Sequence, residues 1–332
     1  MNDFISNMSI KTCPFLWDQI HFSSTGEVMF CCVYYYAVNA PQAPLSINNE
    51  ELFTTLMQIR QQTLSALKNG ADGDFCTGCP EIIEIHKPVA NTSDNAVANW
   101  KVNTLLFGTG TVCNLDCIYC STKKIALTPW REREKNVKRA IDFVRYLQAM
   151  NVIDTTTNAV LGSGEITVHP LRAEILQLFT ENPCKFLINA VEYSTEVENV
   201  LKNGKSRINV SIDSGTPDTY RQIKGGGDYF RTLDNIRRYS RFANITDLKY
   251  ILLPGTNDDT TNLDGFLDFA KEIGANVILS RDFNGIEAFE QKLEEAEKAI
   301  EHFVENAKKR GISHFMSGNM SIGERKEKVR RP

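Results

Sequence analysis

Residues 105–120 read LLFGTGTVCNLDCIYC, a short apolar run that enters a glycine-containing loop with three cysteines. From here onward, short apolar runs alternate with segments that carry apolar residues at three- and four-residue intervals. The predicted strands are 102–107, 159–161, 185–188, 208–212, 248–253 and 277–280. Strands that alternate with helices predict an α/β fold, as a parallel barrel or an open sheet. The cysteine loop therefore follows the carboxyl end of the first strand.

The three cysteines of this loop are Cys113, Cys117 and Cys120, in the spacing Cys-x3-Cys-x2-Cys. Three thiolates from one loop suit a cubane iron–sulfur cluster and leave one iron without a protein ligand. Catalytic metal sites keep such an open position. A structural zinc site is the alternative, but zinc normally has a fourth ligand at matching spacing, and the next histidine is His169. Active sites of α/β barrels lie at the carboxyl ends of their strands, which favours the cluster.

This triplet, with Tyr119 just before its last cysteine, resembles the signature of the radical S-adenosylmethionine (SAM) superfamily. Two further motifs follow in the order that the family implies. Ser163-Gly164-Glu165 resembles the Gly-Gly-Glu motif that receives the SAM amino group, with serine in place of the first glycine. Residues 210–216, VSIDSGT, resemble the segment that contacts the SAM ribose and carboxylate. The resemblance thus implies that Ser211 and Asp213 bind SAM.

The same resemblance extends through the fifth-strand region, at 249–254 and Asn257, and covers residues ~100 to 283. It implies a partial (β/α)6 barrel of the TIM type. Arg281 and Asp282 follow the sixth strand and are candidates to bind SAM or substrate. Each motif has a simpler alternative. These are an ordinary strand-to-helix turn at 162–165, helix capping by Ser211 and Asp213, and a surface ion pair of Arg281 with Asp282.

A second set of cysteines precedes this region. Its opening pattern, Cys-x12-Gly-x4-Cys from residue 13 to residue 31, resembles the SPASM or twitch auxiliary-cluster module of radical SAM enzymes. In the best-known members the module follows the barrel, and downstream cysteines of the full SPASM pattern are missing here, so the shorter twitch-like form is implied. A second 4Fe–4S cluster would then be bound by Cys13, Cys31, Cys76 and Cys79. Zinc is the alternative metal, and Cys32 is the alternative to Cys31.

These patterns predict three domains: an auxiliary-cluster domain at 1–98, a radical SAM core at 99–285 and a C-terminal helix and tail at 286–332. The first has a hairpin-like stretch around Gly26, one helix with apolar residues from Leu52 to Leu67, and a linker at 87–95. The last has one long amphipathic helix over 286–307. Thr195 with Glu198 gives a capping-box signal for a helix of the core. His169 is expected to be structural and Cys184 to be a buried small hydrophobe.

The composition is that of a folded globular protein, with 332 residues, 42% hydrophobic and 23% charged. The net charge of −4 gives no support to nucleic-acid binding. The longest apolar run, 28–38, is shorter than the about 20 residues of a membrane span. With no signal-peptide pattern at the start, a cytoplasmic protein is expected, in which nine cysteines are not structural disulfides.

The resemblance implies an enzyme that cleaves SAM reductively and abstracts hydrogen from a substrate. Its expected partners are SAM, an external one-electron reductant such as a flavodoxin or ferredoxin, and a peptide or a sugar or aminocyclitol substrate. An auxiliary cluster favours a two-electron oxidation or a cross-link, because it offers a place for the substrate's electron. The alternatives are a non-enzymatic iron–sulfur electron-transfer protein and a zinc-stabilised binding module. No catalytic residue is assigned from the sequence.

Overall fold

The structure is a computed structural model that describes residues 10–31, 40–69, 83–85, 100–108, 110–120, 129–282 and 286–317. The chain divides into two compact units that interleave along the sequence. The first comprises residues 1–110, 125–163 and 177–183, and the second comprises 111–124, 164–176 and 184–332. No helix of the described residues is both long and apolar enough to cross a membrane.

In the first unit, a mixed sheet has the strand order β7-β6-β2-β3-β4. Strand β6 pairs in parallel with β7 and β2, whereas β3 pairs antiparallel with β2 and β4. The turn between β2 and β3 contains Gly26 at φ +101°, as the predicted hairpin requires. Its strands are β2 (Gln19–Phe22), β3 (Glu27–Met29), β4 (Gln42–Pro44), β6 (Thr104–Gly108) and β7 (Asn158–Gly162).

The helices of the first unit are α1 (Phe15–Asp18), α3 (Asn49–Lys68) and α4 (Trp130–Ala149), and a separate antiparallel pair is formed by β1 (Ile10–Thr12) and β5 (Ile83–Ile85). Helix α4 packs its buried face against the sheet, where the ring of Phe143 lies 6.2 Å from that of Phe22. Helix α3 is the single helix predicted for the N-terminal segment, and the side chain of Asn48 caps it by accepting from the Glu51 N–H.

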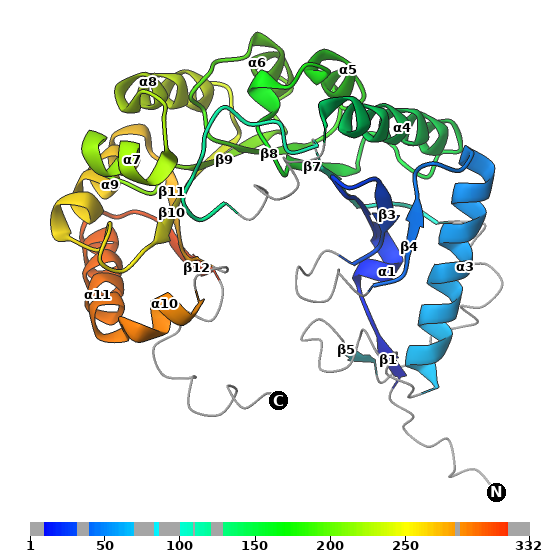
Figure 1. Cartoon of the computed structure of the whole chain (residues 1–332), viewed down its shortest axis with the longest axis horizontal. Coiled ribbons are helices and arrows are strands. Elements are labelled where there is room, and N and C mark those ends of the chain that lie inside the picture. The colour runs from blue at the N-terminus through cyan, green and yellow to red at the C-terminus, as the bar shows by residue number, and fades with distance from the viewer. Residues whose placement is uncertain are drawn as a thin grey trace, which may run out of the picture. The chain divides into compact units, whose positions relative to one another are not determined.

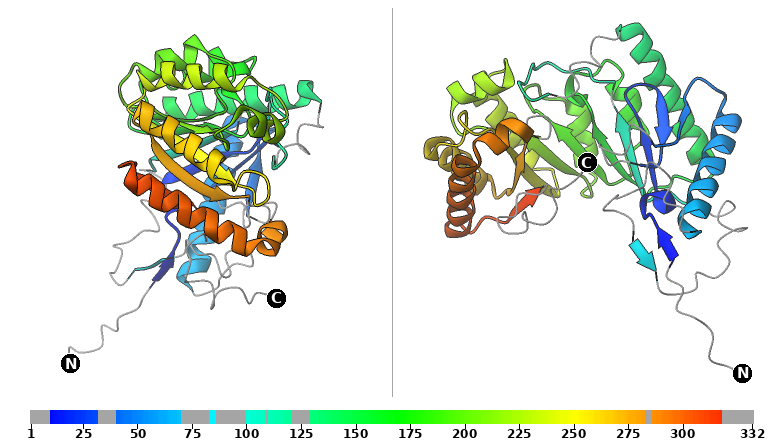
Figure 2. Two further views of the ribbon diagram at one scale, coloured as in Figure 1. Left: turned by 90° about the vertical axis from the view of Figure 1, so that its left-hand side faces the viewer. Right: turned by 60° about the horizontal axis from the view of Figure 1, so that its bottom comes forward.

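In the second unit, all neighbouring strands run parallel in the order β12-β11-β10-β9-β8. Figure 1 shows helices α6–α9 on one side of strands β8–β11. Figure 2 shows α11 beside α9, and Arg310 just after α11 bonds to Asp264 and Asp268 of α9. The strands are β8 (Cys184–Ile188), β9 (Arg207–Ser211), β10 (Ile245–Leu252), β11 (Asn276–Arg281) and β12 (His314–Ser317).

The helices of this part of the chain are η3 (Ile166–Val168), α5 (Arg172–Gln177), α6 (Thr195–Leu201), α7 (Pro217–Lys224), α8 (Tyr229–Ser240), α9 (Thr260–Ile273), α10 (Ile286–Gln291) and α11 (Leu293–Lys309). The six strands predicted from the sequence are thus confirmed as β6 to β11, and the chain has a mixed α/β fold with parallel strands. Strand β12 was not predicted.

Two helix predictions were wrong in detail. The predicted capping box of Thr195 and Glu198 is not formed, because Ser194 is the N-cap and accepts from the Val197 N–H at 3.3 Å. The single C-terminal helix is instead two helices that meet at Lys292, whose backbone leaves the helical region at φ −120° and ψ 38°. The amphipathic period continues across this one-residue break, so the sequence pattern did not reveal it. The predicted linker at 87–95 lies outside the described residues.

A glycine contact fixes α9 against the loop after β9. A Cβ added to Gly215 would lie 2.1 Å from the Asn262 carbonyl oxygen and 2.6 Å from the Phe266 nitrogen. The Asn262 side chain closes the same contact, since its Oδ1 accepts from Ser214 Oγ at 2.9 Å. Only a residue without a side chain fits between these two backbones.

We expect Gly215→Ala to lower the free energy of unfolding by about 3 kcal/mol, because backbone atoms cannot move aside as a flexible side chain can. Gly226→Ala is the matched control, because a Cβ there meets only Leu115 at 3.9 Å. It should change stability by less than about 0.5 kcal/mol. Denaturant unfolding followed by circular dichroism measures both. Equal losses in the two variants would contradict the packing role of Gly215.

Candidate functional site

The cysteine loop lies along the C-terminal turn of α7 in the second unit. The backbone N–H groups of Asp116 and Ile118 donate to the carbonyl oxygens of Lys224 and Ile223, at 3.0 and 2.9 Å. Gly225 ends the helix at φ +65°, and a Cβ there would lie 2.6 Å from the Asp116 carbonyl oxygen. The left-handed cap and the missing side chain together let the loop approach the helix end.

The three loop thiols differ in exposure and lie within electrostatic reach of one another. Cys113 is exposed, whereas Cys117 and Cys120 are half-buried. Burial raises the pKa of the Cys113 and Cys117 thiols, and the charge of Cys120 raises both further. Within the described residues, no three His, Cys, Asp or Glu side chains are grouped to hold one metal ion. The thiolates of a cubane bind separate irons, so the donor set fits that group without meeting at one point.

Tyr119 ties this loop to the core of the second unit. Its hydroxyl donates to Asp213 Oδ2 at 2.5 Å and accepts from Lys224 Nζ at 2.8 Å. Lys224 also forms an ion pair with Asp213, and the side chains of both are at most 1% exposed. The sequence singled out Tyr119 and Asp213 but not Lys224, because a lysine in the last turn of a helix is ordinarily solvated there.

Asp213 is not a helix cap. Its Oδ1 accepts from the Ile251 N–H of β10 at 2.7 Å, and its carbonyl oxygen accepts from Asn257 Nδ2 at 2.8 Å. The cap of α7 is Thr216, whose side chain accepts from the Thr219 N–H. Both carboxylate oxygens of Asp213 are therefore held by donors of the protein itself, which makes it a link between β9, β10 and the cysteine loop.

Glu165 is a buried carboxylate beside the start of the same loop. Its backbone N–H donates to the Val112 carbonyl oxygen at 2.6 Å. Its Oε1 accepts from the Thr167 N–H and hydroxyl at 3.1 and 2.7 Å, and its Oε2 accepts from the Asn189 N–H. Burial raises the pKa of Glu165 to about 7, although these hydrogen bonds oppose the shift. A cation bound at this carboxylate would favour its ionised form.

Asn189 is a site residue that the sequence analysis missed. It follows β8 directly, and its Nδ2 donates to Asn114 Oδ1 at 2.8 Å and to Cys113 Sγ at 3.6 Å. Its own Oδ1 accepts from the Val191 N–H at 3.0 Å, which fixes the amide orientation. The sequence could have indicated Asn189 only through its position, because a polar residue at the carboxyl end of a parallel strand is a candidate site residue.

A residue in the left-handed backbone conformation follows each of four successive parallel strands. Thr111, Ser163, Ala190 and Asp213 have φ values of 59, 58, 59 and 61° and follow β6, β7, β8 and β9. Non-glycine residues rarely adopt this conformation, and those that do concentrate at functional sites. Ser163, of the predicted Ser163-Gly164-Glu165 motif, belongs to the first unit, whereas Gly164 and Glu165 belong to the second.

The other predicted residues lie at strand ends or in the core. Ser211 is the half-buried last residue of β9 and lies in register with Lys249 of β10. Arg281 is the half-buried last residue of β11, and Asp282 follows it. Cys184 is buried as predicted, and burial raises its pKa to about 12. His169 is also fully buried, and its Nδ1 accepts from the Leu171 N–H.

Two of the four predicted auxiliary ligands are described. Cys13 and Cys31 are both half-buried in the first unit, where His21 Nδ1 lies 3.4 Å from the Cys31 carbonyl oxygen. Cys32, Cys76 and Cys79 lie outside the described residues. The second cluster site therefore stays a prediction.

The buried Glu165 predicts a specific pH dependence of stability. A folded-state pKa of about 7, raised from 4.5, means that the neutral form stabilises the fold below pH 4.5 and that this stability is lost as the pH rises through 7. A shift of this size corresponds to about 3 kcal/mol. In SAM-free protein, the free energy of unfolding should fall between pH 5 and pH 8 as Glu165 ionises, and Glu165→Gln should remove this contribution. Denaturant unfolding at both pH values measures it.

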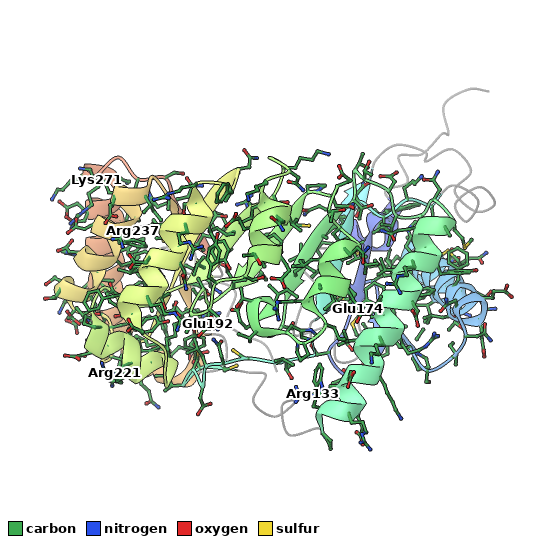
Figure 3. The ribbon with its side chains drawn as sticks, turned by 90° about the horizontal axis from the view of Figure 1, so that it is seen from above. Arg133, Glu174, Glu192, Arg221, Arg237 and Lys271 are labelled. Carbon is green, nitrogen blue, oxygen red and sulfur yellow. The ribbon has the colours of Figure 1, made fainter. Side chains whose placement is uncertain are left out.

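The matched control for this experiment is Glu174→Gln, on the exposed side of α5 (Figure 3). It should keep the pH dependence of the wild type. A Glu165→Gln variant with that same dependence would show that Glu165 does not titrate between these values.

Comparison with known proteins places this site in a family context. Residues 108–267 match the model of the Radical SAM superfamily. Among curated proteins, GTP 3′,8-cyclase of Clostridium botulinum (strain Okra / Type B1) is 23% identical over 182 residues, which are 53% of this chain and 55% of that protein. GTP 3′,8-cyclase of Lactiplantibacillus plantarum is 29% identical over 174 residues, 49% of each chain. The chain thus spans about half the length of the curated relatives it matches.

A solved structure shows the same fold over most of the chain. SuiB of Streptococcus suis, bound to the precursor peptide SuiA, has a TM-score of 0.51 and 13% sequence identity. The match covers 94% of this chain and 73% of that chain. At this identity the likeness shows the fold alone.

Proposed function

We propose that this chain, which contains a radical SAM domain at residues 108–267, is an enzyme that cleaves SAM reductively and removes a hydrogen atom from a substrate. The observation that carries the proposal is the cysteine loop: three thiols of the family's spacing come from one loop, and buried contacts fix that loop to α7 and β9. These contacts would hold the loop, and with it the three cysteines, in a fixed position for a cluster.

Different residues would bind the iron–sulfur cluster and SAM. Cys113, Cys117 and Cys120 would hold the 4Fe–4S cluster and leave one iron open. When bound, the cluster supplies the electron that splits SAM into methionine and a 5′-deoxyadenosyl radical. Glu165 would accept the SAM amino group, whose positive charge compensates the buried carboxylate. Contacts to the rest of SAM are assigned to Tyr119, Ser163, Gly164, Ser211, Asp213 and Arg281.

In this scheme the side chains of Asp213 and Tyr119 mainly hold the cysteine loop in place. Both oxygens of the Asp213 carboxylate are already engaged by protein donors, and one of those donors is the Tyr119 hydroxyl. Contacts of these two residues with SAM would therefore use their backbone groups and the tyrosine ring. The protein's share of catalysis is to orient SAM, exclude water and hold one substrate hydrogen near the reacting carbon.

The finer architecture is part of the same proposal. The core at 99–285 would form a partial (β/α)6 barrel, followed by a C-terminal helical segment at 286–332. The N-terminal domain at 1–98 would hold an auxiliary 4Fe–4S cluster on Cys13, Cys31, Cys76 and Cys79. A cluster with four thiolates has no open iron, so its role would be electron transfer or structure, and an electron accepted from a substrate radical would make the reaction a two-electron oxidation.

The substrate class is proposed from chemistry and likeness together. The relatives named GTP 3′,8-cyclase support a nucleotide, and SuiB, solved with a precursor peptide, supports a peptide. A sugar or aminocyclitol alcohol is the third class, since such alcohols offer the unreactive C–H bonds that a carbon radical attacks. The chain spans about half of those curated relatives, so their activity is not carried over.

Iron content after anaerobic reconstitution tests the two clusters. We expect about eight irons per chain in the wild type, and about four in both Cys117→Ala and Cys76→Ala. Only Cys117→Ala should abolish formation of 5′-deoxyadenosine from SAM with dithionite as reductant. Cys184→Ala is the matched control and should keep the full iron content and full SAM cleavage. Deoxyadenosine formed without Cys117 would exclude the catalytic assignment of the triplet, and zinc in place of iron would favour the zinc-stabilised module.

Deuterium transfer identifies the hydrogen that is removed. A deuterated candidate substrate should place deuterium in 5′-deoxyadenosine, and the product should be two electrons more oxidised than the substrate. A product at the same oxidation level as the substrate, formed with two external electrons consumed for each SAM cleaved, would contradict the oxidation part of the proposal while leaving SAM cleavage intact.

A further inference from the structure

One face of strands β8–β10 in the second unit carries polar and cationic side chains. Helices α6–α9 lie on the other side of these strands (Figure 1), where every second residue is buried. Paired residues of parallel strands point to the same side of a sheet. The register pairs Lys185 with Arg207 and Ser211 with Lys249, so all four share the face away from the helices.

This face is not packed like a barrel interior. Small barrels fill their interior with layers of bulky branched side chains. Here Leu187, in β8, is 37% exposed, and the side chains on either side of it along the face are polar. Lys185, Arg207 and Lys249 are only half-buried. The face is therefore accessible to a ligand and is lined by groups that require a polar one.

Two positive charges of this face have no ion-pair or hydrogen-bond partner among the described residues. Arg207 pairs with Asp247, whose other oxygen accepts from Asn276 Nδ2 at 3.1 Å. Lys224, nearby, pairs with Asp213. The ammonium groups of Lys185 and Lys249 make no hydrogen bond or ion pair within the part of the chain that the structure describes.

The electrostatic environment of the two lysines agrees with this. Burial lowers the pKa of Lys185, and the charge of Arg207 lowers it further, although Asp247 opposes the shift. Burial likewise lowers the pKa of Lys249, and the charges of Lys224 and Lys185 add to the effect against the opposing charge of Asp213. The charge of Lys185 thus acts on Lys249 across β9, and an anion between the two lysines would relieve both the repulsion and the desolvation.

We propose that Lys185 and Lys249 bind the phosphate group of a phosphorylated small-molecule substrate. Two cations that have no ion-pair partner among the described residues match the charge of a phosphate dianion and offset most of the charge of a pyrophosphate, whereas one carboxylate neutralises only one of them. Lysine binds phosphate as a point charge on a flexible arm, which suits two groups that rise from different strands. Lys249 lies in register with Ser211 at the carboxyl end of β9, next to the residues assigned to SAM. The proposal rests on the proposed function, because it places this anion beside the SAM site.

Pyrophosphate is the probe, and its affinity for the full-length, reconstituted protein is measured by isothermal titration calorimetry. We expect binding by the wild type and a loss of at least about tenfold in affinity in the variant with Lys185→Met and Lys249→Met together. The variant with Lys185→Arg and Lys249→Arg keeps both charges and should retain binding. Lys271→Met, at an exposed residue of α9 (Figure 3), is the matched control and should bind like the wild type.

Two further arms decide between sources of the anion. Glutarate, a dicarboxylate, should bind at least about tenfold more weakly than pyrophosphate. Equal or tighter glutarate binding would overturn the phosphate assignment in favour of an acidic peptide or carboxylate substrate. SAM affinity is measured in the same variants. A loss of SAM affinity as large as the loss for pyrophosphate would show that the lysines serve the SAM carboxylate and would also overturn the proposal.

Failure of this proposal and failure of the proposed function give different results. Wild-type protein that cleaves SAM but does not bind pyrophosphate would refute the phosphate site and leave the enzyme assignment standing. Protein that binds pyrophosphate through the two lysines but forms no 5′-deoxyadenosine would refute the enzyme assignment while the anion site stands. Equal pyrophosphate affinity in the wild type and the double methionine variant would show that the two lysines do not bind the anion.

Discussion

The ion pair of Asp213 with Lys224 is the interaction on which the rest of the site depends. Both side chains are out of water, and each would be an uncompensated charge without the other, a situation that typically costs 3–5 kcal/mol. Through the Tyr119 hydroxyl and the Ile251 N–H, the same carboxylate reaches the cysteine loop and β10. The position of the three thiols is thereby coupled to the core of the second unit, although Asn114, Asp116 and Ile118 of the same loop are exposed.

The sequence was most informative where local pattern and tertiary environment agree. The strands β6 to β11 were predictable because buried parallel strands are short apolar runs, and the cysteine spacing is a local feature of one loop. Lys224 and Asn189 were not predictable in this way. Lys224 is buried only because Asp213 meets it across the fold, and the amide of Asn189 acquires its role from a loop 75 residues earlier in the chain.

The N-terminal segment shows how a region with few apolar residues is held. In the described residues β2 adds to the sheet in parallel with β6, and Arg60 donates to the Leu16 carbonyl oxygen at 2.6 Å while lying 5.1 Å from the Trp17 ring. Pairing with a strand far along the chain is invisible to periodicity, because a strand of four residues carries too little pattern.

The left-handed residues after β6, β7, β8 and β9 have a consequence for how this scaffold can change. Each costs of order 1–3 kcal/mol, and each lies within three residues of the end of its strand. A loop that keeps this one backbone state at its root can exchange the rest of its residues without disturbing the strand behind it. The four positions therefore keep a constant backbone conformation while the loops beyond them change. Glycine adopts this conformation without strain, so it is the residue that an evolving or redesigned loop can place there most readily.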